Sequence, residues 1–327
     1  MYHDEMLPNY LVLTPDGVGS TYLQRALTVY LHSANMNYWN THELLNGIGI
    51  KDGNLYKEVQ ATPYAQSLEN ICKLLSTTNN FLVSRIAKYH IDARLNERYE
   101  DYNLFYELCE KKFDIIVFCQ RDPFEYALSW GIRRSAKKRN VYSINERIEA
   151  HGVHVKEPID LDFFQRKLNQ YTDYEYWAYD NFYITNKIDY NNINYNIDSV
   201  VKEITGLTHS VKDRFGISLQ DYSRYRYLIS MYKQTKDKEY FFNGIEVLDE
   251  MCNLHSMIEK LFYIHKLPTT IPIKMNTLSD KRSRITNFDQ AVEIYNNWAV
   301  KGNSHEIVTE ETIANKIDAE RQNYAHR

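Results

Sequence analysis

The feature that most constrains the fold is the alternation of short apolar runs with segments of helical periodicity. The run NYLVLT, residues 9–14, is short, rich in β-formers and ended by Pro15, which is typical of a buried strand. From Ser20 onward the pattern is that of a helix, with apolar residues at 23, 26, 27, 30 and 31 on one face. These residues predict a strand, a tight loop and a helix.

The same order recurs further along the chain. Apolar runs predict strands at 81–91, 113–119 and 181–190, and helices are predicted around 104–112, after Arg121, and over 196–207 with Gly206 near the end. Strands that alternate with helices predict an α/β fold, with a central parallel sheet flanked by helices in three layers. We expect one domain over 1–327, with its core motifs in 9–207 and a C-terminal helical and loop portion over 208–327.

The composition and net charge narrow the partners and cofactors that we expect for this protein. The 327 residues are 43% hydrophobic and 25% charged, with a net charge of −4, so we expect neither a nucleic-acid nor a membrane partner. No apolar run reaches 18 residues, and we expect a cytoplasmic protein. The four cysteines are scattered, and the pair of histidines in HGVH (151–154) has no third ligand nearby, so no metal is expected.

Ligands of parallel α/β sheets bind beyond the carboxyl ends of the strands, which directs attention to 15–22, 88–90, 120–129 and 190. In the first of these segments, Gly17 and Gly19 allow a tight turn, and Ser20 and Thr21 add hydroxyl donors at a helix N-terminus. This is the layout of a phosphate loop, although a purely structural turn has the same pattern. A Walker A loop also needs a lysine, which is absent here, so ATP or GTP hydrolysis is not expected.

Two other strand ends carry cations. Arg121 follows one apolar run and Ser129 lies two helical turns later, so both could bind one phosphate; the alternative is a structural arginine paired with a carboxylate. Lys88 and His90 are two residues apart, so in a continuing strand they would face the same side and could act as electrophile and general base. The alternative is a structural histidine.

In combination these motifs resemble the sulfotransferases that use 3′-phosphoadenosine 5′-phosphosulfate (PAPS). That family has a P-K-S-G-T-T-W-L loop, a K-T-H element, an R-x₇-S element and a Y-E-D-L segment. Here the corresponding stretches are GVGSTYL at 17–23, KYH at 88–90, RDPFEYALS at 121–129 and IDYNNI at 188–193. They occur in the family's order, and the resemblance covers about residues 9–207.

The resemblance implies a P-loop-like sulfotransferase fold, PAPS as co-substrate, no metal, and a small-molecule or carbohydrate hydroxyl as acceptor. His90 would take the acceptor's proton, and Lys88 would steady the sulfuryl group. Residues 17–22 of the loop, Arg121 with Ser129, and Tyr190 would bind the nucleotide. The implied loop residues are Gly17, Val18, Gly19, Ser20, Thr21 and Tyr22. The family's C-terminal basic segment that grips the 3′-phosphate would correspond to Lys281, Arg282 and Arg284, for which a solvated charged loop is the alternative.

One departure from the family pattern concerns charge. The family has a lysine or arginine where this chain has Gly17, and the preceding residue is Asp16. Three accounts stay open: Lys88 supplies the charge; Arg25, the RRSAKKR run at 133–139 or the 281–284 cluster supplies it; or the protein binds nucleotide without turnover. The function classes that follow are a PAPS-dependent sulfotransferase, a catalytically degenerate nucleotide-binding protein on the same fold, and an unrelated P-loop-type kinase, which the missing lysine disfavours.

Overall fold

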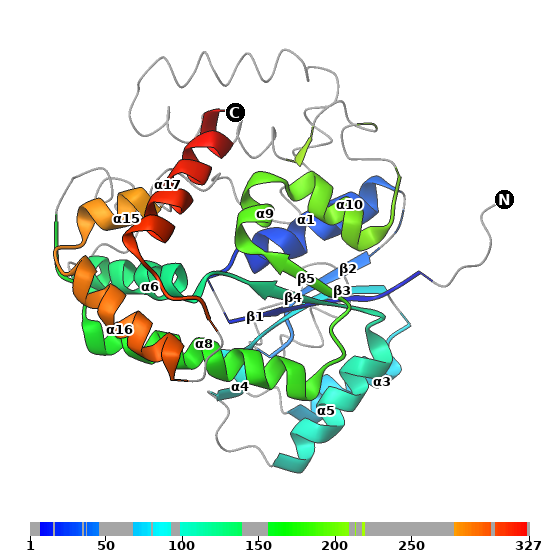
Figure 1. Ribbon diagram of the computed structural model, residues 1–327. Helices are drawn as coiled ribbons and strands as arrows, with labels where there is room; N and C mark the ends of the chain where they lie inside the picture. Colours follow the sequence, from blue (N-terminus) through cyan, green and yellow to red (C-terminus); the bar gives the residue numbers. More distant parts are fainter. Residues whose placement is uncertain are drawn as a thin grey trace. The chain divides into compact units, whose positions relative to one another are not determined.

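The chain forms two compact units (Figure 1). The computed structural model describes residues 7–15, 17–34, 36, 38–45, 68–79, 81–92, 99–138, 156–208, 213, 218–219, 278–301 and 305–325. The first unit comprises Met1–Gln120 and Tyr176–Ile271, and the second comprises Arg121–Glu175 and Pro272–Arg327. The sequence predicted one domain over 1–327 that includes a C-terminal portion at 208–327; in the structure, the last segment of the chain belongs to the same unit as Arg121–Glu175.

A parallel five-stranded sheet forms the centre of the first unit, in the order β2-β3-β1-β4-β5. The strands are β1 (Tyr10–Thr14), β2 (Tyr38–Glu43), β3 (Phe81–Ala87), β4 (Ile115–Gln120) and β5 (Asn186–Asp189). Each residue of β1 is buried, as expected for a central strand covered on both faces. The predicted α/β fold with a parallel sheet is confirmed; β2 was not predicted.

Helices cover both faces of this sheet, which gives three layers (Figure 1). On one face α1 (Ser20–Ser33) packs against α10 (Ile197–Thr205), and on the other α3 (Leu68–Thr77) packs against α5 (Tyr99–Lys112). The apolar stripe that predicted α1 is buried along its whole length. Gly206 ends α10 in the left-handed conformation, with φ 66°, as its position suggested.

Two predicted strands are shorter in the structure, for identifiable reasons. β3 ends at Ala87, which pairs with Thr14; the next residue of the neighbouring chain segment is Pro15, which has no N–H to continue the ladder. β5 begins only at Asn186 because the preceding helix runs to Asn181. It ends at Asp189, whose carboxylate accepts a 2.7 Å hydrogen bond from the Asn191 N–H and so caps α9 (Tyr190–Tyr195).

The second unit is helical in its described part. Its helices are α6 (Pro123–Lys138), most of α8 (Leu161–Asn181), α15 (Leu278–Arg284), α16 (Phe288–Val300) and α17 (Glu310–Ala325). Phe124 lies at its core, with its ring centroid 5.2–6.0 Å from those of Phe164, Phe288 and Tyr295. Asp122 caps α6, because the Glu125 N–H donates to Asp122 Oδ1 at 3.0 Å.

The described residues contain neither a candidate membrane span nor a candidate metal cluster. No helix there has the length and apolar character that crossing a membrane requires. Nor does that part of the chain bring together three or more His, Cys, Asp or Glu side chains in an arrangement that could hold a metal ion.

Candidate anion-binding site

The loop after β1 lies where the connections of neighbouring strands diverge. β1 is central and leads into α1 on one face of the sheet, whereas its neighbour β3 leads through α4 (Lys88–Asp92) to α5 on the opposite face (Figure 1). Because Thr14 pairs with Ala87, the loop and α4 leave the sheet from adjacent positions. Such a switch point at the carboxyl edge is where parallel sheets bind their ligands.

The loop backbone contains two glycines in the left-handed conformation. Gly17 and Gly19 have φ of 73° and 74°, which only glycine adopts readily, and buried Val18 lies between them. Left-handed residues in a turn can help to orient backbone N–H groups toward an anion. The first turn of α1, which follows at Ser20, contains no acidic residue, so the positive end of the helix dipole is not opposed there by a carboxylate of that turn.

A buried arginine stands directly beneath this loop. Arg85 of β3 is only 4% exposed, and its Nη1 donates hydrogen bonds to Ser20 Oγ, at 3.2 Å, and to Thr21 Oγ1. Each of these hydroxyls accepts from the arginine with an oxygen lone pair and keeps its own O–H hydrogen for another acceptor. The positive charge of Arg85 therefore acts on the loop through its hydrogen bonds to these two hydroxyl groups.

A second cation adds to the positive potential. Arg25 lies one helical turn after Thr21 and is half-buried. Burial, and then the positive charge of Arg85, lower the pKa of the Arg25 guanidinium to about 10. Both arginines are therefore charged at neutral pH and repel one another, and a bound anion would relieve that repulsion.

Helix α9 closes one side of the loop. A Cβ added to Gly19 would lie 3.2 Å from Ile193 Cγ2 and 3.4 Å from Tyr190 Cδ2. The structure therefore brings Tyr190, which the resemblance assigns to adenine, against the glycine loop 171 positions earlier in the chain. Tyr22, assigned to the same base, is buried on α1.

Gly19→Ala is expected to destabilise the first unit more than Gly206→Ala. Both substitutions force a side chain into the left-handed region, at a cost of roughly 1–2 kcal/mol. Gly206 has nothing within 4 Å of the added Cβ, whereas Gly19 has Ile193 in tight contact. Urea unfolding of the two variants measures the difference, for which we expect about 1 kcal/mol or more. Equal losses would show that α9 does not press on the loop.

The predicted shared face of Lys88 and His90 is wrong. The strand stops at Ala87, and both residues belong to the short helix α4, on which positions two apart do not face the same side. His90 is buried and Lys88 is half-buried. Both still follow β3 immediately, at the edge of the sheet that carries the glycine loop.

The two residues assigned to the 3′-phosphate lie in the second unit. Arg121 follows the last residue of β4, is 5% exposed, and its backbone N–H donates to Tyr171 Oη at 2.8 Å. Ser129 Oγ donates to the Glu125 carbonyl at 2.8 Å, within α6. To donate to a phosphate, the Ser129 hydroxyl would have to release this intrahelical bond.

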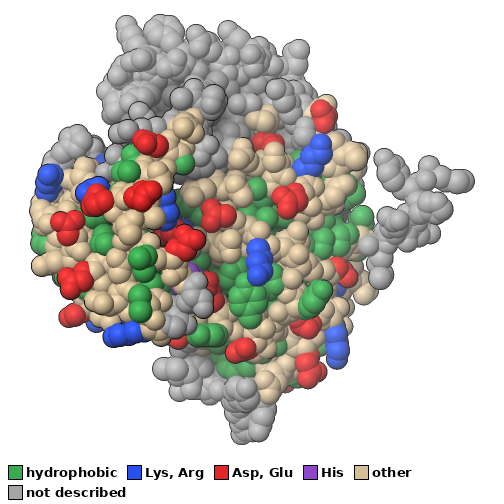
Figure 2. Space-filling model, viewed as in Figure 1, with side chains coloured by type: hydrophobic (Ala, Val, Ile, Leu, Met, Phe, Trp, Pro, Cys, Tyr) green, Lys and Arg blue, Asp and Glu red, His purple; other side chains and the backbone are tan. Residues whose placement is uncertain are grey.

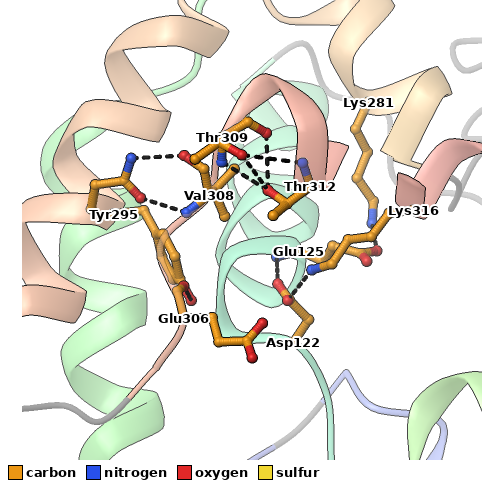
Figure 3. Close-up of polar contacts among 10 residues, drawn as sticks. Asp122, Glu125, Lys281, Tyr295, Glu306, Val308, Thr309, Thr312 and Lys316 are labelled. Carbon is orange, nitrogen blue, oxygen red and sulfur yellow. Dashed lines mark hydrogen bonds and ion pairs between the residues drawn. The ribbon is translucent and has the colours of Figure 1, made fainter. Parts of the chain in front are cut away.

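The C-terminal basic residues form a helix, α15, and not a solvated loop. Lys281 is 1% exposed and forms an ion pair with Glu125, with Nζ 2.8 Å from Oε2 (Figure 3). Arg282 is exposed, pairs with Glu310 at 2.9 Å and lies over the ring of Phe288. The Arg284 carbonyl accepts a 2.8 Å hydrogen bond from the Glu157 N–H. The Lys281 and Arg282 side chains therefore have different environments.

The positive charges of interest are buried and do not form a surface patch. On the face shown in Figure 2, the described Lys and Arg side chains are scattered among acidic ones. Arg85, Arg121 and Lys281 are each at most 5% exposed. Of the other cations considered, Arg134 in the 133–139 run pairs with Asp160 at 3.2 Å.

Sequence reasoning missed Arg85 as the cation beneath the loop. The signal was present, since an arginine inside the apolar run FLVSRIA must find polar partners if the strand is central.

Asp16, the histidines of HGVH and Cys252 lie outside the described residues. Comparisons with family models, with curated proteins and with solved structures gave no match.

Proposed function

We propose that this protein is a sulfotransferase that moves the sulfuryl group of PAPS to a hydroxyl acceptor, with Arg85 in place of the missing loop cation. The observation that carries the proposal is the contact of the buried Arg85 guanidinium with the Ser20 and Thr21 hydroxyls at the foot of the two-glycine loop. The motif order that resembles the family supports it. Arg85 also answers the question that Gly17 raised, since a positive charge reaches the loop from the neighbouring strand.

The chemistry needs charge stabilisation more than covalent catalysis. In the transfer, the acceptor oxygen bonds to sulfur, the bond from sulfur to the 5′-phosphate oxygen breaks, and negative charge develops on the departing phosphate. The loop N–H groups and the Arg85-linked hydroxyls would stabilise that charge. His90 would take the acceptor's proton, and Lys88 would steady the sulfuryl oxygens.

The rest of the nucleotide would be held by side chains that the resemblance indicates. Tyr190 lies against Gly19 and Tyr22 lies on α1, and both would contact adenine. Arg121 and Ser129 would bind the 3′-phosphate. This assignment makes a specific demand, because binding must then depend on the 3′-phosphate and not on the adenosine alone.

A second candidate is a nucleotide-binding protein without turnover, on the same fold. Gly17 favours it, since the residue at this position in the family carries the positive charge. Incubating the protein with sulfur-labelled PAPS and a panel of alcohols, phenols and sugars separates the two candidates. Labelled product supports the sulfotransferase, whereas tight PAPS binding with no product across the panel supports the second candidate.

His90→Ala is expected to abolish most turnover and to leave nucleotide binding intact. Loss of a general base typically lowers the rate about 10²–10⁴-fold. His90 belongs to a five-residue helix after β3 and not to the glycine loop, so the affinity for adenosine 3′,5′-bisphosphate should stay within about threefold of the wild-type value. Steady-state rates and calorimetric titration of the same preparation measure both quantities. A normal rate would show that the base lies elsewhere.

A further inference from the structure

Helix α1 is buried along its first turns except at two positions. Of residues 20–31, only Thr21 and Arg25 are not fully buried. They are four residues apart, so they are neighbours on one face of the helix. Gln24 fixes the rotation of α1, because its Nε2 donates a 3.1 Å hydrogen bond to the Val83 carbonyl of β3. Arg25 follows Gln24 directly, so the accessible pair lies beside β3.

Arg25 is linked to the glycine loop through Thr21. The Thr21 hydroxyl accepts a hydrogen bond from Arg85 and lies in the first turn of α1, directly after the loop. Helical side chains lean toward the N-terminus of their helix, so we expect the Arg25 side chain to extend back over the turn that contains Thr21. One guanidinium group from α1 and one from β3 then serve the same turn.

The Arg25 guanidinium is not engaged in the fold. Among the described residues it has neither a hydrogen-bond partner nor an ion-pair partner. Its half-buried charge and the charge of Arg85 repel one another, in agreement with the lowered pKa of Arg25. A partly buried charge that is not compensated is unfavourable in a folded protein. An anion with two negative charges, bound at the loop, would compensate both arginines.

We propose that Arg25 binds the 5′ group of the nucleotide together with the loop, so that this group is shared between Arg25 and the hydroxyls that Arg85 contacts, and is selected for carrying two negative charges. The inference rests on the proposed function, which assigns the 5′-phosphosulfate to the loop. It adds a specificity-determining residue to which the resemblance gives no role. PAPS fits this charge, with one negative charge on the phosphate and one on the sulfate, and so does the 5′-phosphate of the product.

The test uses three nucleotides that share the 3′-phosphate and differ in the charge at the 5′ position. Adenosine 3′,5′-bisphosphate carries two negative charges on its 5′-phosphate at about pH 8. Its 5′-methyl ester carries one negative charge there, and adenosine 3′-monophosphate carries none. Calorimetric titration of each nucleotide measures how much affinity each 5′ charge adds.

The proteins are the wild type, Arg25→Gln, Arg25→Lys and a control, Lys73→Gln. Lys73 is exposed on α3, in the same unit but on the opposite face of the sheet, so this control removes the same charge at a distance from the loop (Figure 1). In the wild type and the control, we expect affinity to fall roughly tenfold or more from the bisphosphate to the ester. In Arg25→Gln this difference should shrink to within about threefold, because the second charge has lost its partner.

Two further readouts separate ligand binding from a structural role. Adenosine 3′-monophosphate should bind equally to all four proteins, and Arg25→Lys should retain part of the difference between bisphosphate and ester. Urea unfolding of the unliganded Arg25→Gln protein should show it to be at least as stable as the wild type, since the substitution removes the repulsion from Arg85. An Arg25→Gln protein that fails to fold, or is clearly less stable, would show that Arg25 supports the fold and would overturn the inference.

The titrations also have distinct outcomes. A smaller difference between bisphosphate and ester in Arg25→Gln, with unchanged binding of the 3′-monophosphate, supports the inference. A difference of wild-type size in Arg25→Gln, equal loss of all three nucleotides, or a wild type that does not distinguish the bisphosphate from its ester overturns it. Absence of bisphosphate binding by the wild type overturns the proposed function together with this inference, whereas 3′-dependent wild-type binding with no effect of Arg25→Gln overturns the inference alone.

Discussion

Arg85→Met is expected to lower the rate of sulfuryl transfer by on the order of 10²–10³, the usual effect of removing one donor that stabilises developing negative charge. Arg85 is the buried cation that contacts both Ser20 and Thr21 beneath the loop. Methionine has a similar length and no charge, so the β3 position stays filled. The measurement is the transfer rate at saturating PAPS, with urea unfolding as the test that the variant is folded.

Arg85→Lys is the matched variant. Lysine keeps the positive charge, but its side chain is shorter and lacks the guanidinium Nη1 that contacts both hydroxyls, so we expect an intermediate rate. An Arg85→Met protein that is folded and transfers sulfuryl at the wild-type rate would contradict the role of Arg85. The charge would then have to come from Arg25 or Lys88.

Lys281→Met is expected to have the largest effect on stability, lowering the free energy of unfolding by about 3–5 kcal/mol at neutral pH. It leaves Glu125 as a buried carboxylate that has lost its 2.8 Å partner. Replacing both residues, by Glu125→Gln with Lys281→Met, should recover most of the loss, since a neutral pair needs no charge compensation. Urea unfolding of the three proteins tests this expectation.

The cost of Lys281→Met should depend on pH. In the wild type, burial raises the pKa of Glu125, but Lys281 and the neighbouring cations bring it below its ordinary value of 4.5. The stability that Glu125 contributes is therefore present above about 4.5 and is lost as the pH falls through the lower, folded pKa. In Lys281→Met, protonation of Glu125 removes the buried charge, so the two proteins should approach one another in stability toward acid pH. A gap that stays constant from pH 7 to 4 would mean that Glu125 is not the source of the cost.

Much of the first unit could be predicted from the sequence because local rules and tertiary structure agree there. The run NYLVLT has the apolar centre YLVL and contains the fully buried strand Tyr10–Thr14, and the periodic stripe after Ser20 forms the buried face of α1. The glycines of the loop, which predicted a tight turn, adopt positive φ. The helix predicted after Arg121 is α6, and Asp122 caps it.

The failures have a common physical origin in partners that are distant in the chain. The strand predicted over 81–91 stops where its neighbour β1 ends, and no pattern within 81–91 records that limit. β2 was missed because YWNTHE is polar at four of its six positions and depends on β3 for its pairing. A strand boundary set by a neighbour cannot be read from local periodicity.

The candidate site likewise contains some residues that the sequence indicated and others whose role only the structure reveals. The loop, Arg121 and Tyr190 stand at strand ends and could be found by that rule alone. Arg85 lies inside a strand, where only its contact with α1 reveals a role. In the sequence, Lys281 belongs to a basic segment that the resemblance assigns to the 3′-phosphate, with a solvated charged loop as the alternative. Its burial against Glu125, which lies 156 positions earlier in the chain, is visible only when α6 and α15 are placed together.

The central claim is that the protein binds a nucleotide through its 3′-phosphate as well as its 5′-phosphate. The most direct test is calorimetric titration of the wild-type protein with adenosine 3′,5′-bisphosphate, with 5′-AMP and ATP as comparisons. We expect binding of the bisphosphate that weakens tenfold or more when the 3′-phosphate is absent, by analogy with other charge-assisted contacts. No binding of the bisphosphate, or a preference for ATP, would contradict the account. The loop that contains Gly17 and Gly19 would then be a structural turn or part of a different nucleotide site.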